Sequence, residues 1–371
     1  MLLACDATAI KRPLTGVQNA VRHQLEALTR ALTPQLATPL LLARRDLLPD
    51  GLAQDGAPRL AQPPACVRHP LARVLWQQTH LPLLLRRLHA DALYAFAYTA
   101  PLACPVPYIL NVHDTIALDH PELCARLNRW QMRLLLPASI RGAALCVAST
   151  QHGADAIMRR LGLPASRIRV ISLGVDAARF AAPAPPPDGL QERPYLLFLS
   201  NIEPKKGLDT LLDAYAKTAD RLDADLVIVG RAAWKSADTI RRLRDWRGPG
   251  RLRWLHYVPD DRLPALYQHA HAFVMPSLVE GFGLPILEAM AAGTPVIHSD
   301  HPALMEAAGG AGLPFRVQDS DSLADALLRL HGDAHGRQTL IQAGRRHADR
   351  RSWRRWGELA AQCVAELASR L

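Results

Sequence analysis

The stretch Pro276-Ser277-Leu278-Val279-Glu280-Gly281-Phe282-Gly283-Leu284-Pro285-Ile286-Leu287-Glu288 decides the fold, because it joins an apolar strand to a helix. The apolar run before it predicts the strand, and Pro285 suits the first turn of the helix. Gly293 ends the helix before another apolar run begins. In open α/β sheets ligands bind where strand ends meet helix N-termini. We therefore expect Glu280 and Glu288 to address one pocket.

The chemistry of this loop suits a ligand with phosphate and hydroxyl groups. Gly281 and Gly283 let backbone N–H groups approach a phosphate closely, and carboxylates accept hydrogen bonds from sugar or ribose hydroxyls. The alternative is that Glu280 caps the helix and Glu288 lies on a solvated face. A dinucleotide fingerprint fits poorly, because Ile286 stands where a third glycine is needed. The strand–loop–helix context favours a binding site.

A second loop carries a cationic pair. Ser200-Asn201-Ile202-Glu203-Pro204-Lys205-Lys206-Gly207 follows a predicted strand and precedes a helical stripe. The chain has only five lysines, and two of them are adjacent here. Positive charge at a helix N-terminus opposes the helix dipole unless an anion binds there, and a diphosphate is a natural anion. Two solvated surface lysines are the alternative.

In the first half of the chain, two further candidates follow predicted strands. His113-Asp114 comes directly after the apolar run at 108–112. A histidine at the carboxyl end of a strand is a candidate for ligand contact, although a hydrogen-bonded structural histidine is an equal alternative. Thr15-Gly16 follows the first strand in a similar position, where glycine permits close approach of a ligand.

Short apolar runs alternate with amphipathic stretches, which predicts an α/β fold with parallel sheets covered on both faces. The predicted strands are the N-terminal residues, 37–42, 108–112, 144–148, 168–171, 195–199, 226–230, 272–275 and 295–297; the predicted helices include 17–28, 208–215, 263–270 and 323–330. Four prolines and a glycine at 181–189 predict a stiff linker. We therefore expect Rossmann-like α/β/α domains at 1–182 and 183–351.

Composition narrows the class of protein. The chain has 371 residues, 49% of them apolar, and no apolar window long enough for a membrane-spanning helix. Aromatics are scarce at 5%, and the arginines are dispersed, which argues against a nucleic-acid partner. The six cysteines are scattered and lack the spacing of a metal site. Scattered cysteines of this kind are typical of reduced thiols in a cytoplasmic protein.

The positive charge is uneven. Residues 1–189 hold 20 basic and 12 acidic residues, a net of +8, and the remainder holds 24 against 22, a net of +2. An arginine-rich proteome explains this, but so does a first half that faces an anionic membrane surface. Arg86-Arg87, which follow the apolar run at 81–85, suit such a surface. We therefore expect a cytoplasmic protein, peripheral on the inner face of the membrane.

The motifs together resemble the nucleotide-sugar-dependent glycosyltransferases of family 4. The segments that carry the resemblance are 280–288, 289–296, 203–207 and 263–277, with Thr15-Gly16 and Val112-His113-Asp114 in the first half. The family has the GT-B architecture, in which two Rossmann-like domains face each other across a cleft. Ser352-Trp353 resemble the start of its terminal helix, which implies that 352–371 pack back on the first domain.

The resemblance implies a retaining transferase with a nucleotide-sugar donor and no metal or other cofactor. Glu288 would hold the ribose hydroxyls, and Glu280 would lie near the diphosphate and the sugar. Lys206 would neutralise the leaving diphosphate, and His113 would contact the sugar near its anomeric centre. The implied catalytic residues are thus His113, Glu280 and Lys206. The implied donor-binding residues are Gly16, Asn201, Lys205, Gly281, Phe282, Gly283, Leu284 and Glu288.

One departure from the family pattern concerns the phosphate clamp. Many members have an arginine in the place of Asn201, so more of the charge compensation falls on Lys205 and Lys206, or on Arg12. Asp223-Ala224-Asp225 looks like the aspartate motif of another glycosyltransferase fold, but it precedes a strand and is not expected to bind a metal.

Three classes of function stay open from the sequence: a retaining transferase, a sugar-nucleotide epimerase or phosphorylase of the same architecture, and a non-catalytic binding module. The motif forms look like those of mannosyl- and rhamnosyltransferases of bacterial polysaccharide synthesis. GDP-mannose is therefore the favoured donor, with UDP-glucose, UDP-N-acetylglucosamine or a deoxyhexose donor as alternatives. The expected acceptor is a lipid-linked saccharide or a lipopolysaccharide core.

Overall fold

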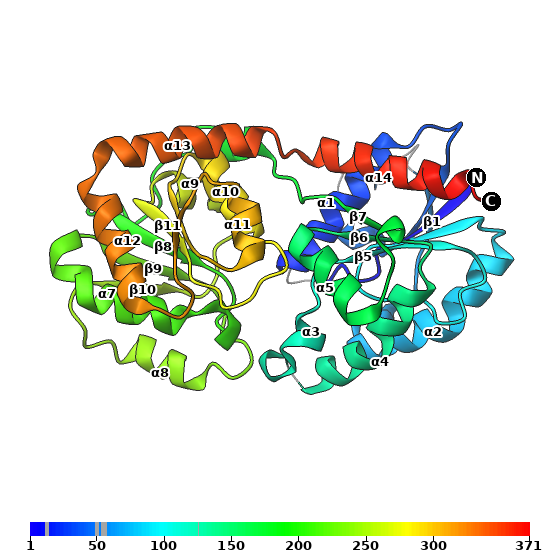
Figure 1. The fold of residues 1–371 in the computed structure, drawn as a ribbon, viewed down its shortest axis with the longest axis horizontal. Coiled ribbons are helices and arrows are strands. Elements are labelled where there is room, and N and C mark those ends of the chain that lie inside the picture. Colours follow the sequence, from blue (N-terminus) through cyan, green and yellow to red (C-terminus); the bar gives the residue numbers. More distant parts are fainter. Residues whose placement is uncertain (12–14, 49–51, 53–57, 125) are drawn as a thin grey trace. The chain divides into compact units, whose positions relative to one another are not determined.

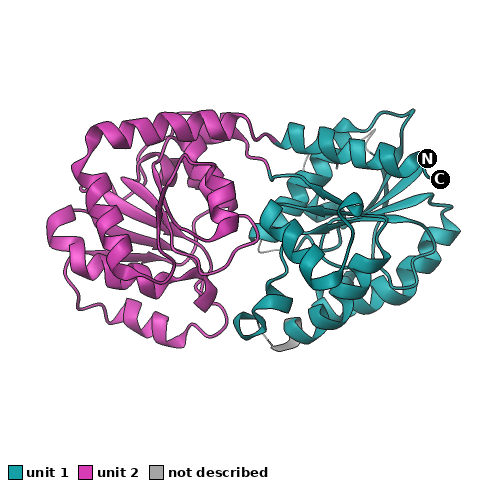
Figure 2. Cartoon of the chain, in the orientation of Figure 1, with its two compact units in different colours: residues 1–173, 353–371 teal, residues 174–352 magenta. Residues whose placement is uncertain are grey.

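The computed structural model describes the whole chain except residues 12–14, 49–51, 53–57 and 125, and omits the side chains of 126–128. The chain forms two compact units, shown in Figure 2. Unit 1 consists of Met1–Leu173 and Trp353–Leu371, and unit 2 consists of Gly174–Ser352. Each unit is an α/β structure with a parallel sheet (Figure 1).

Unit 1 is built on a seven-stranded sheet with the order β3-β2-β1-β4-β5-β6-β7. Every pairing in it is parallel. The strands are β1 (Leu2–Asp6), β2 (Thr38–Leu42), β3 (Arg59–Ala61), β4 (Ala92–Ala95), β5 (Tyr108–Val112), β6 (Leu145–Ala148) and β7 (Ile168–Val170). The helices are α1 (Gly16–Ala31), α2 (Pro70–Arg87), α3 (Ile116–Asp119), α4 (Arg126–Gly142), α5 (Gln151–Leu161) and α14 (Trp353–Ala368).

Alternate residues of the central strands in unit 1 supply two separate cores, as a sheet covered on both faces requires. In β1, Leu3 and Cys5 pack with α1 and α14, whereas Ala4 packs with α2, α4 and α5. Trp356 of α14 is 1% exposed and lies in the first of these cores. The terminal helix is therefore an integral part of unit 1.

Unit 2 is built on a six-stranded sheet with the order β10-β9-β8-β11-β12-β13, again with parallel pairings. The strands are β8 (Tyr195–Leu199), β9 (Asp225–Val229), β10 (Leu252–Leu255), β11 (Ala272–Met275), β12 (Val296–Ser299) and β13 (Leu313–Phe315). The helices are α6 (Ala177–Ala181), α7 (Leu208–Leu222), α8 (Ala237–Arg244), α9 (Leu263–Gln268), α10 (Leu284–Ala292), α11 (Pro302–Ala308), α12 (Ser320–Gly332) and α13 (Ala334–Asp349).

Each strand and helix predicted from the sequence has a counterpart in the structure, with shifts of a residue or two at the ends of the strands. Four strands escaped prediction, because they are short or follow turn-rich segments: β3, β4, β10 and β13. The division between units falls after Leu173, ahead of the boundary expected after residue 182. The reason is that α6 packs against α9 and α10 of unit 2. Within the described residues, no helix has the length and apolar character needed to cross a membrane.

Candidate functional site

The loops after β8 and β11 meet at one edge of the unit 2 sheet, because these two strands are neighbours. The N–H of Leu278 donates to the carbonyl of Lys205 at 2.8 Å, which joins the loops through the backbone. Gly207 has φ +65°, and a Cβ at this position would lie 1.9 Å from the carbonyl oxygen of Pro276. Only glycine fits here, so the close approach of the two loops is built into the sequence.

This approach brings together two of the predicted catalytic residues. Lys206 Nζ lies 2.5 Å from Glu280 Oε1, with side chains only 15% and 11% exposed. The hydroxyl of Ser277 donates to the same carboxylate oxygen at 2.9 Å. Burial by itself would raise the pKa of Glu280, but Lys206, Lys205 and Ser277 outweigh it and lower the pKa. Glu280 is therefore an ionised carboxylate held by a cation, not a helix cap.

The β8 loop also contains Lys205, Glu203 and Asn201. Lys205 Nζ is 3.4 Å from Glu203 Oε1, so both lysines have a carboxylate neighbour. Asn201 is exposed, directly after the strand. Gly230, at the end of neighbouring β9, would place a Cβ 1.8 Å from the Ser200 carbonyl oxygen. Only glycine therefore fits at position 230, where the backbone passes close to the start of the β8 loop.

Helix α10 begins at this edge without a side-chain cap. Its N-cap residue Gly283 has φ +102°, and no side chain caps the first turn. The side chains of Phe282 and Leu284 are 5% and 8% exposed and belong to the interior. Their predicted part in donor binding, through backbone N–H groups, stays a prediction. Pro285 lies in the first turn and Gly293 ends the helix with φ +82°, both as the sequence predicted.

Glu288 has a different environment from Glu280. It is 8% exposed, and Tyr267 in α9 donates a hydrogen bond to its Oε2 at 2.9 Å. Burial raises the pKa of Glu288 to about 7; Tyr267 and Arg179 oppose this rise, and Asp260 adds to it. Arg179 and Asp260 form an ion pair at 3.0 Å. The raised pKa favours the protonated carboxyl, so a ligand that binds the carboxylate form must displace a proton where Glu288 is protonated.

In unit 1, His113 follows β5 and is 7% exposed. Its Nε2 lies 2.9 Å from the Phe96 carbonyl oxygen, so this nitrogen carries the proton and Nδ1 is left as the acceptor. Burial lowers the pKa of His113, although Phe96 and Asp114 oppose the change. Tyr98 packs edge-on against the imidazole and donates to Asp114 Oδ2 at 2.5 Å. A neutral histidine in a fixed orientation results.

Gly16 is the first residue of α1, after the N-cap Thr15. A Cβ at Gly16 would meet none of the described atoms within 4 Å, so packing within the described chain does not explain the glycine. Arg12, the suggested extra phosphate cation, lies outside the described residues.

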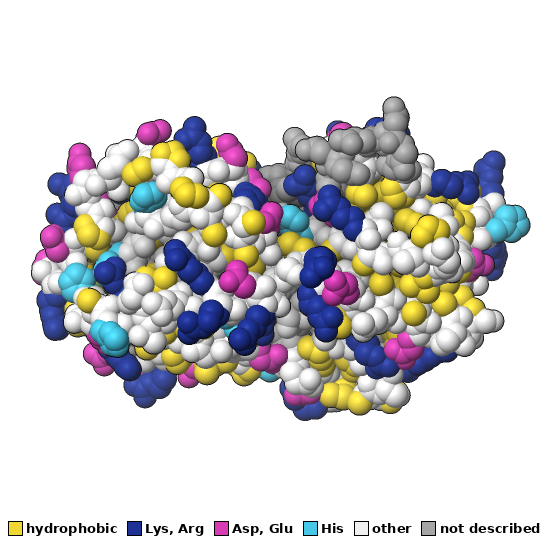
Figure 3. Space-filling view, turned by 90° about the horizontal axis from the view of Figure 1, so that it is seen from above, with side chains coloured by type: hydrophobic (Ala, Val, Ile, Leu, Met, Phe, Trp, Pro, Cys, Tyr) yellow, Lys and Arg dark blue, Asp and Glu magenta, His cyan; other side chains and the backbone are white. Residues whose placement is uncertain are grey.

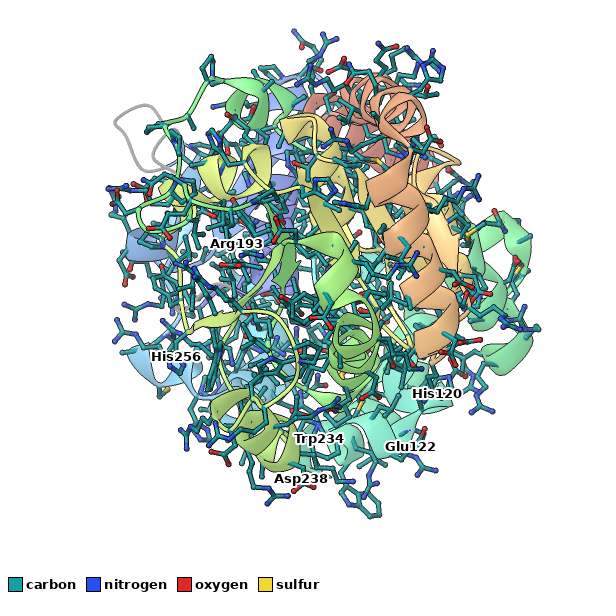
Figure 4. All side chains as sticks on the ribbon, turned by 90° about the vertical axis from the view of Figure 1, so that its left-hand side faces the viewer. His120, Glu122, Arg193, Trp234, Asp238 and His256 are labelled. Atoms are coloured by element: carbon teal, nitrogen blue, oxygen red, sulfur yellow. The ribbon has the colours of Figure 1, made fainter. Side chains whose placement is uncertain are left out.

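Asp223 and Asp225 both form ion pairs with arginines. Arg193, labelled in Figure 4, lies 3.2 Å from Asp225 and also pairs with Asp223. Arg253 lies 3.1 Å from the second oxygen of Asp225. Across the described residues, no group of three or more His, Cys, Asp or Glu side chains is placed to hold a metal ion.

The structure brings Lys206 and Glu280 together and places Glu288 on the helix that follows. Gly16 and His113 lie in the other unit, so whether the predicted residues share one site stays a prediction. Sequence reasoning missed Tyr267 and Ser277, which are partners of the two glutamates. Tyr267 carried a usable signal, as a tyrosine at the end of a helical stripe with a polar hydroxyl to satisfy.

Comparison with known proteins defines the class. The family described as Glycosyltransferase Family 4 matches residues 15–179, and Glycosyl transferases group 1 matches residues 186–347. Sucrose-phosphate synthase from Thermosynechococcus elongatus has the same fold, with a TM-score of 0.77 and 19% identity over 100% of this chain and 99% of that one. The predicted GT-B fold is confirmed.

Relatives of similar sequence include two mannosyltransferases. O-antigen chain mannosyltransferase B of Escherichia coli is 31% identical over 66% of this chain and 66% of its own length. The GDP-mannose-dependent alpha-(1-6)-phosphatidylinositol monomannoside mannosyltransferase of Mycobacterium tuberculosis is 34% identical over 67% of this chain and 80% of its own length. The chain belongs to the family 4 glycosyltransferases. It spans about half to two thirds of the length of the first relatives that it matches.

Proposed function

We propose that this protein is a retaining hexosyltransferase that moves mannose from GDP-mannose to a lipid-linked saccharide or a lipopolysaccharide acceptor. The observation that carries the proposal is the buried Lys206–Glu280 pair beside the uncapped N-terminus of α10. The names of the relatives support the sugar, because both are mannosyltransferases and one depends on GDP-mannose. The names of the same relatives support the proposed acceptor, because one is an O-antigen chain mannosyltransferase and the other is named for a phosphatidylinositol monomannoside.

The proposed reaction breaks the bond between the anomeric carbon and the diphosphate and forms a bond from the acceptor oxygen to the same face of that carbon. The acceptor proton passes to the departing phosphate oxygen. Negative charge grows on the diphosphate as the sugar acquires oxocarbenium character. Lys206 and the N–H groups of the α10 first turn are fixed donors that stabilise this charge. Glu280 holds Lys206 in place and accepts a hydrogen bond from the sugar.

Glu288 is proposed to bind the ribose hydroxyls of the nucleotide. Its carboxylate form accepts two hydrogen bonds from a vicinal diol, and these compensate for the burial that raises its pKa. Donor binding therefore favours loss of the Glu288 proton. The roles that the family resemblance gives to Gly16 and His113 stay predictions, as do those of Asn201 and Lys205.

We propose that no metal takes part, because Lys206 and the helix N-terminus supply the positive charge that the leaving diphosphate needs. A screen of donor turnover with GDP-, UDP- and dTDP-sugars, with and without a chelator, tests both donor and metal. Fastest turnover of GDP-mannose, unchanged by the chelator, is expected. Preference for a UDP-sugar would overturn the donor assignment, and turnover of a nucleotide sugar into an epimer without an acceptor would overturn the transferase assignment.

A further inference from the structure

Polar side chains gather in unit 1 at the carboxyl ends of β1, β4 and β5, which are neighbours in the sheet. Asp6 ends β1, Tyr98 and Thr99 follow β4, and His113 and Asp114 follow β5. By contrast, charged side chains of both signs are interspersed over the surface of unit 2 along which α13 runs (Figure 3). The cluster in unit 1 includes the histidine that is expected to contact the donor sugar, so its geometry bears on the proposed reaction.

Tyr98 has an unusual backbone conformation in this cluster. Its φ is +58°, in the left-handed region that a bulky side chain rarely adopts. The N–H of Thr99 donates to the Ala97 carbonyl at 2.6 Å, so Tyr98 is the central residue of a γ-turn. A γ-turn with positive φ is rare and strained. Strain of this kind persists only where the surrounding structure holds it, and it is concentrated at functional sites.

A buried glutamine of α2 holds the strained turn in place. Gln77 Nε2 donates to the Thr99 carbonyl at 2.9 Å, and Thr99 Oγ1 donates to Gln77 Oε1 at 2.8 Å. Gln77 Nε2 also donates to Asp6 Oδ2 at 2.8 Å, which links the turn to the end of β1. Gln77 and Thr99 are each 1% exposed, and Asp6 is 4% exposed. A buried network from β1 and α2 therefore fixes the backbone around Tyr98.

The turn brings the Tyr98 side chain against the two residues that follow β5. The ring packs edge-on against the His113 imidazole, with the ring centroids 5.4 Å apart. The hydroxyl donates to Asp114 Oδ2 at 2.5 Å, and Asp114 Oδ1 accepts from the Ile116 N–H at 3.0 Å. Because Nε2 of His113 lies 2.9 Å from the Phe96 carbonyl oxygen, the same loop contacts the imidazole at two places.

Packing alone does not explain a tyrosine at this position. The Tyr98 ring is partly buried against both cores of unit 1, but leucine or phenylalanine would fill this place without a hydroxyl group. The backbone does not explain it either, because glycine would adopt the same φ without strain. The tyrosine is therefore best explained by the contacts that its ring and its hydroxyl make with His113 and Asp114.

We propose that Tyr98 is a positioning residue for His113, whose imidazole it orients by ring packing and by holding the neighbouring Asp114 carboxylate. In this orientation the Nε2 proton stays on the Phe96 carbonyl, and Nδ1 is the acceptor that is presented to a sugar hydroxyl. The effect on turnover rests on the proposed function, in which His113 contacts the donor sugar. The orientation of the imidazole does not depend on that function and is measured separately.

The first test follows the His113 ring by NMR in the full chain labelled with ¹⁵N-histidine, with His113→Gln to assign its signals. We expect one sharp Nε2–H signal and an unprotonated Nδ1 in the parent protein. Tyr98→Leu loses both the ring edge and the hydroxyl, so the signals should broaden or split as the imidazole gains other orientations. Tyr98→Phe keeps the ring and should broaden them less. Signals in Tyr98→Leu that match those of the parent would overturn the proposal.

The second test measures donor turnover. Tyr98→Phe should lower kcat about tenfold, as for the loss of a hydrogen bond to a charged group, with the donor KM within about twofold. Because the hydroxyl acts through Asp114, adding Tyr98→Phe to Asp114→Asn should lower kcat by less than about twofold further. Losses that multiply would overturn this route of action. Full kcat in His113→Gln would instead overturn the role of His113 in the proposed function and leave the NMR result unaffected.

Tyr108→Phe is the matched control, because it removes a tyrosine hydroxyl from the same unit. The Tyr108 hydroxyl donates to the Ser139 carbonyl at 2.7 Å and lies at the start of β5, away from the His113 end of the strand. The control should keep kcat within about twofold of the parent and leave the His113 signals unchanged. Equal changes in Tyr98→Phe and Tyr108→Phe would show that any lost buried hydroxyl has this effect, and would overturn the proposal.

Discussion

Glu280 and Glu288 are the same residue type, eight positions apart, yet the structure gives them opposite protonation behaviour. Glu280 lies in a loop against Lys206, which lowers its pKa despite burial. Glu288 lies inside α10 with Tyr267 as its hydrogen-bond partner, and burial raises its pKa to about 7. A nearby full charge outweighs burial, whereas a hydroxyl does not.

The difference indicates a division of work between the two carboxyl groups. Lys206 and Glu280 hold each other in place at 2.5 Å, so their charges need little rearrangement when the diphosphate departs. Burial of the Glu288 carboxylate is unfavourable, and a ligand that donates hydrogen bonds to this carboxylate compensates for the lost hydration. The Lys206–Glu280 pair should therefore govern turnover, and Glu288 should govern donor binding and its pH dependence.

The largest expected effect comes from Lys206→Ala. The variant removes the proposed cation for the leaving diphosphate and leaves Glu280 buried without its partner. We expect kcat to fall about thousandfold, as for the loss of a key electrostatic donor, and the free energy of unfolding to fall as well. Steady-state kinetics with the best donor and thermal unfolding measure the two effects.

Lys217→Ala is the matched control, because Lys217 pairs with Asp321 at the surface of the same unit. It should change kcat by less than about twofold. Adding Glu280→Gln to Lys206→Ala should restore stability without restoring activity, because it removes the unpaired charge. Full activity of the Lys206 variant would contradict the assigned role.

Gly207→Ala should have the next largest effect, on the loop contact that brings Lys206 to Glu280. Its Cβ would lie 1.9 Å from the Pro276 carbonyl oxygen, so the two loops must separate. We expect a loss of at least about 3 kcal/mol in the free energy of unfolding, with a clear loss of turnover.

Gly162→Ala provides a matched comparison for Gly207→Ala. Gly162 ends α5 with nearly the same φ, +67° against +65°, but a Cβ there would meet no described atom within 4 Å. It should cost only about 1–2 kcal/mol, the strain of the left-handed backbone alone. Equal losses in the two variants would show that backbone strain, and not the crossing of the loops, sets the cost.

Glu288→Gln should weaken donor binding by about tenfold to a hundredfold, because a neutral amide replaces a charged acceptor. The KM for the donor should rise far more than kcat falls. In the parent protein, KM should decrease as pH rises through about 7, where Glu288 loses its proton. The Gln variant should show no such decrease, and its persistence would show that another group titrates.

The raised pKa of Glu288 also predicts how the stability of the folded protein depends on pH. The folded protein keeps the Glu288 proton up to about pH 7, whereas the unfolded chain loses it near the ordinary pKa of 4.5. The folded state therefore binds more protons between these values, and stability falls as pH rises from about 4.5 to 7. Glu288→Gln should remove this slope and raise the unfolding temperature at pH 8.

Much of the site in unit 2 was predictable because it depends on local sequence. Strand, glycine loop and helix start follow each other around Glu280, and the adjacent lysines stand out in a lysine-poor chain. Neighbouring parallel strands then bring their carboxyl ends together, so the meeting of Lys206 with Glu280 follows from topology.

Other features depend on long-range packing, which a single sequence does not show. Tyr267 meets Glu288 only because α9 packs on α10. The boundary between the units lies before α6, and not after it as the sequence predicted, because α6 packs against α9 and α10 of unit 2. The pKa values of the two glutamates likewise follow from burial and partners, not from residue type.

Tyr267→Phe should have the smallest effect and sharpens the comparison most, because it changes only the partner of Glu288. The Tyr267 hydroxyl donates to Glu288 Oε2 and opposes the rise in its pKa. Its loss should raise that pKa further, so the pH at which KM improves should move upward, while kcat at high pH changes less than about threefold. Tyr195→Phe is the control, because the Tyr195 hydroxyl donates instead to the Leu266 carbonyl at 2.7 Å. A shift in the opposite direction, or the same shift in the control, would show that the hydroxyl does not tune this carboxyl group.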